Sequence, residues 1–237
     1  MSGVSVVRVP ILPFGLVNAH LVVINRTVLL VDSGLPGTEK KVKRALSKMG
    51  LSFSDIALIV ITHAHVDHAG NASYLRKLSG APILGHEADL SYYRREKPMT
   101  FCATGWFGRL FIKTGLMFQQ YEAFEPDIIL RDKEALHLSR FGFDGIVRHT
   151  PGHTGGSISI ELASQEALVG DLVASGILLG GIMCTDHAKK PPFEENAKAV
   201  GKSLEELVSR GNKKFYMGHG GPLPAEEVLR HAKKIMS

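Results

Sequence analysis

Residues 62–70 read Thr-His-Ala-His-Val-Asp-His-Ala-Gly and place three histidines and one aspartate within six positions, directly after the apolar run Ile-Ala-Leu-Ile-Val-Ile. Such a run is typical of a buried strand that ends where the polar cluster begins. Because alternate residues at the end of a strand point the same way, His63 and His65 can converge on one metal ion. Asp67 and His68 follow in the tightening turn and can face a second ion. Burying these groups without a metal would be costly, so the stretch predicts a metal site.

The composition is that of a soluble enzyme-sized domain. The chain has 237 residues, of which 44% are hydrophobic and 22% charged, which is enough apolar material for one β-rich core. The net charge of +5 is spread along the chain, so we expect no nucleic-acid partner. Cys102 and Cys184 are isolated thiols, which indicates a reducing compartment and no disulfide framework. No secretory leader or membrane-spanning run stands out, and we therefore expect a cytoplasmic protein without membrane contact.

Hydrophobic periodicity divides the chain into two strand-rich halves, each followed by amphipathic helices. Helices are expected from Thr38, as the cap, to Gly50; through 72–80; from 86; from 194; and from Pro224. Strands are expected at 4–9, 20–24, 27–31, 56–61, 81–84, 135–139, 144–149, 157–162, 166–169 and 215–217. We see no internal repeat, and we predict one domain over 1–237.

One stretch, residues 98–126, does not fit this pattern. It concentrates aromatic and soft apolar side chains between glycines, and their spacing matches no single helix face. Two interpretations stand side by side: an inserted lid or homodimer surface near the metal site, or a satellite core. Residues 176–193, which are rich in glycine and proline, are expected to form a loop over the site.

Three further fragments carry polar residues at the ends of expected strands. His153 lies in Thr-Pro-Gly-His-Thr-Gly-Gly-Ser, Asp171 follows Gly170, and His219 lies between two glycines. Each fragment alone is a weak indication of a ligand, but the ordered set is strong.

Together, the fragments THAHVDH, TPGHTGGS, GD and GHG resemble the metallo-β-lactamase superfamily, and are closest in pattern to its glyoxalase II-like and lactonase-like hydrolases. The resemblance extends over nearly the whole chain, including the early run LLVDSG. It implies an α+β fold, a four-layer αββα sandwich of two sheets with helices outside, and our expected order of elements agrees with it.

The resemblance implies seven ligands around two ions: His63, His65 and His153 for one, Asp67, His68 and His219 for the other, and Asp171 between them. Imidazole and carboxylate ligands suit Zn²⁺ first, with Mn²⁺ or iron as alternatives. Two such ions can hold a bridging hydroxide that attacks a carbonyl carbon, and Asp67 can then carry a proton to the leaving group.

Several neighbouring residues have more open roles. Asp32 and Thr62 either orient the ligand histidines or cap turns. His20 can line the pocket. We interpret the remaining candidates as structural or surface histidines: His86, His137, His149 and His187.

The function that follows is a dinuclear metal-dependent hydrolase of a small carbonyl substrate: a lactone, thioester, ester or β-lactam. The apolar segment 98–126 would suit an acyl chain and slightly favours a lactone or thioester. The first alternative is a persulfide dioxygenase-like enzyme with a single iron. A metallo-nuclease is less favoured because no basic stripe is present, and an inactive binding module is disfavoured because all seven implied ligands are there.

Overall fold

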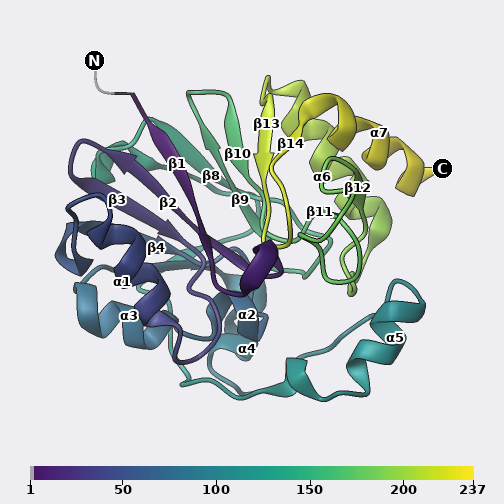
Figure 1. Cartoon of the computed structure of the whole chain (residues 1–237), viewed down its shortest axis with the longest axis horizontal. Coiled ribbons are helices and arrows are strands. Elements are labelled where there is room, and N and C mark those ends of the chain that lie inside the picture. The colour runs from purple at the N-terminus through teal and green to yellow at the C-terminus, as the bar shows by residue number, and fades with distance from the viewer. Residues whose placement is uncertain (1–2) are drawn as a thin grey trace.

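The computed structural model describes residues 3–237. Its two large sheets pack face to face, with α1 (Glu39–Ser47) and α3 (Ala72–Ser79) outside the first and α6 (Ala197–Ser209) and α7 (Ala225–Met236) outside the second (Figure 1). The expected αββα sandwich of the α+β class is confirmed.

The first sheet is antiparallel at its start and parallel afterwards. Its order is β1 (Ser5–Pro10), β2 (Asn18–Ile24), β3 (Thr27–Val31), β4 (Ile56–Val60), β5 (Ile83–His86) and β6 (Ile128–Leu130). From β3 onward all neighbouring strands run parallel, so their carboxyl ends meet at one edge.

The second sheet is antiparallel except for one central pair. Its order is β14 (Leu223–Pro224), β13 (Lys214–Tyr216), β10 (Glu166–Leu168), β9 (Ile158–Leu162), β8 (Gly145–His149) and β7 (Ala135–His137). The pair β10 and β13 is parallel, which brings their two carboxyl ends together.

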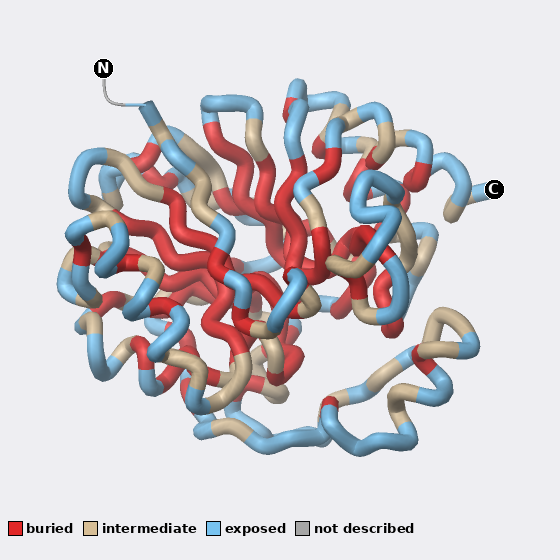
Figure 2. Tube along the Cα trace, in the orientation of Figure 1, coloured by how far each residue is buried: buried red, intermediate tan, exposed pale blue. Residues whose placement is uncertain are grey.

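The strands of both sheets are largely buried (Figure 2), and strand alternation divides their apolar residues among three core layers. In β3, Leu29 and Val31 face the layer between the sheets, whereas Val28 and Leu30 face the layer under α1 and α3. A third layer joins the second sheet to α6 and α7 through residues such as Phe215. Burial of each valine, leucine or phenylalanine side chain contributes roughly 1.5–3 kcal/mol to the free energy of folding relative to an exposed side chain. The three layers therefore stabilise the frame beneath the site.

The shorter elements connect this frame. They are α2 (Val66–Ala69), α4 (Leu90–Tyr93), α5 (Trp106–Ile112), β11 (Ala174–Ser175), β12 (Ala188–Lys189) and the 3-10 helices η1 (Pro13–Gly15), η2 (Phe53–Asp55), η3 (Glu87–Asp89), η4 (Leu116–Phe118) and η5 (Leu138–Phe141). Among residues 3–237 no helix has the length and apolar character needed to cross a lipid bilayer.

Thr38 is the N-cap residue of α1, as expected, but its hydroxyl donates to the carbonyl of Leu35 and makes no capping hydrogen bond. Residues 98–126, whose spacing matches no single helix face, contain the short helix α5, which projects from the body of the molecule (Figure 1) and is partly exposed (Figure 2). Its apolar residues point in several directions: the ring of Phe111 contacts that of Phe193, whereas Trp106 and Leu110 are exposed.

Candidate metal centre

The parallel strand ends bring all seven predicted ligands to one edge of the sandwich. The turn after β4 carries the cluster that begins at His63, and it meets three loops of the second sheet. These loops follow β8, β10 and β13 and carry His153, Asp171 and His219 respectively. Carboxyl ends of strands are where ligands bind in open α/β sheets, and here both sheets contribute side chains.

The first group is a triangle of ring nitrogens. His63 Nε2 lies 3.1 Å from His65 Nδ1, and His153 Nε2 lies 3.1 Å and 3.0 Å from those two atoms. Each hydrogen bond between neutral imidazoles needs one N–H and one lone pair. Three atoms in a closed triangle cannot satisfy this for all three pairs, so at least one contact must be repulsive. A cation at the centre accepts all three lone pairs, and the triangle therefore fits a metal.

The second group combines histidines with carboxylates. His219 Nε2 lies 2.9 Å from Asp171 Oδ2 and 3.4 Å from Asp67 Oδ2. His68 Nε2 lies 3.4 Å from Asp171 Oδ1, and both atoms are buried without a hydrogen-bond partner among the described residues. Asp171 Oδ2 is also 3.8 Å from His153 Nε2, which places this carboxylate between the two groups. Two unpartnered atoms aimed at the same place fit a second cation.

A buried network fixes which nitrogen of each histidine faces the centre. Thr62 Oγ1 donates to Asp32 at 2.9 Å and accepts from Nδ1 of His63 at 3.0 Å. The same carboxylate accepts from Nδ1 of His68 at 2.8 Å. Both rings therefore carry the proton on Nδ1 and leave Nε2 with its lone pair towards the centre. Asp32 and Thr62 thus orient the rings of His63 and His68, in agreement with the first of the two roles expected for them.

His219 is held in a similar way by the backbone. Its Nδ1 donates to the carbonyl of Leu16, so its Nε2 is free to face Asp171. The preceding Gly218 has to be glycine, because a Cβ there would lie 2.3 Å from Asp171 Oδ1 and from a carbon of the His68 ring.

Asp89 is a buried residue of the site that we did not predict. Its carboxylate accepts from the backbone N–H of Ala64 at 2.9 Å, the hydroxyl of Thr154 at 3.0 Å and the N–H of Gly156 at 3.0 Å. It therefore ties the turn that carries His63 and His65 to the turn that carries His153. The pattern of residue types gave no indication of this, because two of its three partners are backbone amides.

The protonation states agree with two different environments. Burial lowers the pKa of His65 to about 3 and that of His153 to about 4, which keeps these rings neutral with lone pairs available. Burial also opposes charge on His219, but Asp171 outweighs it and raises the pKa of that ring to about 10. For Asp67, burial is outweighed by His68, and its pKa is held below its usual value. The carboxylates of the second group are therefore stabilised by positive charge, which protons on the histidines or metal ions can supply.

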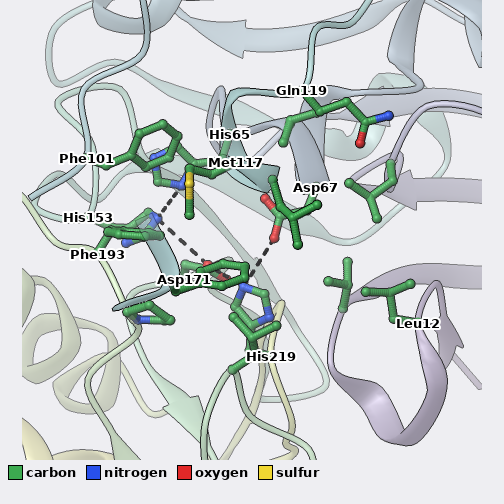
Figure 3. Close-up of a pocket in the computed structure, with 17 residues that line it drawn as sticks. Leu12, His65, Asp67, Phe101, Met117, Gln119, His153, Asp171, Phe193 and His219 are labelled. Carbon is green, nitrogen blue, oxygen red and sulfur yellow. Dashed lines mark hydrogen bonds and ion pairs between the residues drawn. The ribbon is translucent and has the colours of Figure 1, made fainter. Parts of the chain in front are cut away.

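A cavity of about 190 Å³ opens directly onto the centre. Figure 3 shows Asp67, His153 and His219 grouped around Asp171, with Phe101 and Met117 beside them in the lining of the cavity. The ring of Phe101 stacks on that of His65 at 4.9 Å between centroids. Residues from 98–126 and from 176–193 both line the cavity, so the two irregular segments meet at the site as side walls.

The other histidines lie apart from the centre. His20 is buried against the ring of Tyr216 and is not among the residues that line the cavity. The rings of His86 and His149 stack at 3.8 Å, and each bonds a backbone carbonyl. Two more are surface residues, as expected: His137 and His187.

Comparison with known proteins agrees with this geometry. The family model described as the metallo-β-lactamase superfamily matches residues 12–219. A probable metallo-hydrolase of Bacillus subtilis (strain 168), YqjP, is 24% identical over 96% of this chain and 75% of its own length. The hydroxyacylglutathione hydrolase GloC of Haemophilus influenzae is 26% identical over 69% of this chain and 68% of its own.

A solved structure extends the likeness to three dimensions. The metallo-β-lactamase family protein TTHA1429 from Thermus thermophilus superposes with a TM-score of 0.69 and 25% identity, over 99% of this chain and 78% of that one. With the family model matching most of the chain and a buried cluster of histidine and aspartate able to hold metal, the chain belongs to the metallo-β-lactamase superfamily of metal-dependent hydrolases.

Proposed function

We propose that the protein uses two divalent ions, Zn²⁺ by preference, to hydrolyse a small carbonyl compound such as a lactone, thioester or ester. The observation that carries this is the pair of adjoining ligand sets, the nitrogen triangle of His63, His65 and His153 and the unpartnered atoms of His68 and Asp171. Ligand sets of imidazole and carboxylate suit zinc before other ions. The name of the relative GloC supports a thioester as one candidate substrate.

His63, His65 and His153 would hold one ion; Asp67, His68 and His219 would hold the other; Asp171 would contact both. Ions bound there supply Lewis acidity and lower the pKa of a bound water to about 7. The side chains of the protein do the rest.

Asp67 is placed to move the proton. Its carboxylate lines the cavity, with Oδ2 3.4 Å from Nε2 of His219, and its lowered pKa keeps it ionised before the reaction. When water adds to the carbonyl carbon, one of its protons passes to Asp67 and then to the departing oxygen or sulfur as the acyl bond breaks. The apolar wall beside Phe101 excludes water from the rest of the cavity, which strengthens the electrostatic effects at the centre.

Metal stoichiometry tests the proposal most directly. Plasma mass spectrometry of protein purified without chelator should find two equivalents of zinc or manganese. His153→Ala and His219→Ala should each lower the metal content and abolish hydrolysis, because each belongs to a different ligand set. His137→Ala is the matched control, since this histidine is exposed and lies outside the cluster.

A different result would redirect the assignment. One equivalent of iron with little other metal would contradict the dinuclear hydrolase and favour oxygen-dependent sulfur chemistry. Full metal content in both ligand variants would contradict the ligand assignment.

A further inference from the structure

The cavity beside the metal centre has an unusual balance of side chains for a site that binds a polar metabolite. Of the seventeen residues that line it, five belong to the candidate centre and eleven are Leu, Val, Phe, Met or Pro. Gln119 is the remaining one. The described lining thus contains no lysine or arginine.

We infer that the substrate is an uncharged acyl compound whose apolar chain lies along this wall, and that substrates with a carboxylate away from the reacting bond are poorly accepted. This inference rests on the proposed hydrolase and names its substrate class. A second carboxylate in the cavity would need a cation from the wall, because the metal ions are engaged by the reacting group. Without such a partner a buried charge is strongly disfavoured.

The two lysines of the neighbouring segment 176–193 are already engaged. Lys189 donates its Nζ to the carbonyl of Leu178, and Lys190 lies 3.5 Å from the carboxylate of Glu194. Neither lines the cavity. A carboxylate on the substrate would have to break one of these contacts to gain either lysine as a partner.

The aromatic residues of the cavity wall indicate the direction in which the acyl chain of the substrate would lie. The ring of Phe101 stacks on that of His65 at the centre. The centroids of the Phe101 and Phe193 rings are 5.0 Å apart, and those of the Phe193 ring and the Phe111 ring of α5 are 6.2 Å apart. This row of aromatic rings runs outward from the metal centre. An acyl carbon held at the centre would therefore continue along ring faces, where burial of each methylene is favourable.

The size of the cavity limits how much of the chain is enclosed. Its volume of about 190 Å³ is below the roughly 300–1,000 Å³ of typical ligand pockets. Leu116, which lines the cavity, is 63% exposed, and Phe118, whose ring contacts that of Phe101 from outside the lining, is 51% exposed. A longer chain would leave the enclosed part and cover these two side chains, so we expect the gain per carbon to fall once the cavity is filled.

Matched substrate pairs test the inference with the metal-loaded enzyme. Thioesters of N-acetylcysteamine are neutral, whereas those of glutathione present the same acyl group and sulfur with added carboxylates. From acetyl to hexanoyl, kcat/KM for the neutral series should rise about threefold to fourfold per methylene. The neutral hexanoyl thioester should exceed its glutathione counterpart by at least about tenfold.

Two variants with matched controls locate the effect. Phe111→Ala should flatten the dependence on chain length, whereas Leu110→Ala, on the same helix but outside the cavity lining, should leave it unchanged. Leu116→Arg should raise kcat/KM for the glutathione thioester and lower it for the neutral one. Leu110→Arg adds the same charge away from the lining and should do neither.

A binding measurement separates this inference from the proposed function. Calorimetry with the non-hydrolysable thioethers S-hexyl-N-acetylcysteamine and S-hexylglutathione should show tighter binding of the neutral compound. Hydrolysis with a preference for the glutathione thioester would overturn the inference and leave the hydrolase standing. No hydrolysis of any pair, with two metal equivalents present, would overturn a thioester as the substrate of the proposed hydrolase, and the thioether comparison would then decide the inference alone.

Discussion

At the scale of single residues, Asp32 stands out because one carboxylate orients two ligand histidines. It accepts from Thr62, which in turn accepts from His63, and it accepts directly from His68. Its backbone is left-handed, with φ of 62°, a conformation that aspartate and asparagine tolerate better than most residues. Asp32 therefore combines a left-handed backbone conformation, which few residue types adopt, with a hydrogen-bonding role that needs a carboxylate.

Asp32→Asn should weaken metal binding by roughly 10- to 100-fold while keeping the backbone conformation. The amide has one acceptor oxygen and a nitrogen that can only donate, so it cannot receive both hydrogen bonds. Competition with a chelator of known affinity measures the change. Asp186→Asn is the control, because that carboxylate also pairs with a histidine, His187, but on the surface. Equal metal affinity in Asp32→Asn and wild type would refute the role of this carboxylate.

Two adjacent glycines in the turn after His153 give a sharp comparison. A Cβ at Gly156 would lie 2.5 Å from the carboxyl carbon of Asp89, whereas a Cβ at Gly155 would meet nothing closer than 3.8 Å. Gly156→Ala should therefore cost about 1–3 kcal/mol of unfolding free energy and lower the metal content by displacing Asp89. Urea unfolding and metal analysis measure both, with Gly155→Ala as the control. Similar behaviour of the two variants would show that Asp89 does not tie the two turns together.

At the scale of elements, α7 carries a buried titratable group, His231. Burial, together with the charges of Lys190 and Arg230, lowers the pKa of this ring to about 4 from 6.5, and its Nε2 has no hydrogen-bond partner among the described residues. Between these two pH values the unfolded chain binds a proton that the folded chain excludes. Stability should consequently fall as the pH drops through this window.

We expect the free energy of unfolding of chelator-treated protein to fall when the pH is lowered from 6.5 to 4. The fall should be about 2–3 kcal/mol larger for the wild type than for His231→Leu, which lacks the buried imidazole. Comparing the two proteins cancels the titration of the metal-site histidines, which both retain. Denaturant unfolding at several pH values gives the slopes. His137→Leu, at an exposed histidine, should keep the slope of the wild type. Parallel slopes for wild type and His231→Leu would contradict the prediction.

The regular elements could be predicted because their sequences carry their own periodicity. The expected strand 157–162 corresponds to β9 (Ile158–Leu162), and the helix expected from Pro224 corresponds to α7 (Ala225–Met236). The helix α5 could not be predicted, because its aromatic side chains contact rings distant in sequence, such as Phe193, instead of forming one apolar face. The seven clustered residues could be named from their sequence motifs. Asp89 was missed because it accepts hydrogen bonds from backbone N–H groups, which any residue type can supply.

At the scale of the whole molecule, the two sheets share the metal centre. The first sheet provides the cluster at 63–68, and the second provides His153, Asp171 and His219. Since the unfolded chain cannot hold these groups together, metal binding should stabilise the folded state. Because ligands come from both sheets, separation of the sandwich would also release the metal.

Removal of metal should therefore lower the thermal stability of the complete protein. At free zinc 100-fold above the dissociation constant, binding contributes about 2.7 kcal/mol, which corresponds to roughly 5–10 °C in Tm for a chain of this size. Differential scanning calorimetry with and without chelator measures the shift. His153→Ala should show a smaller shift, because it lacks one ligand from the second sheet. An unchanged Tm on chelation would show that the ions do not hold the two sheets together.

Trp106 is the only tryptophan of the 237 residues, and it lies on α5 with 67% of its surface exposed. The intrinsic fluorescence of this indole consequently reports on α5 and on no other part of the fold. Because Trp106 is not among the residues that line the cavity, a shift of its emission would report a change in the surroundings of α5 itself. The chain thus contains its own optical probe, without any attached label, for movement or covering of this helix.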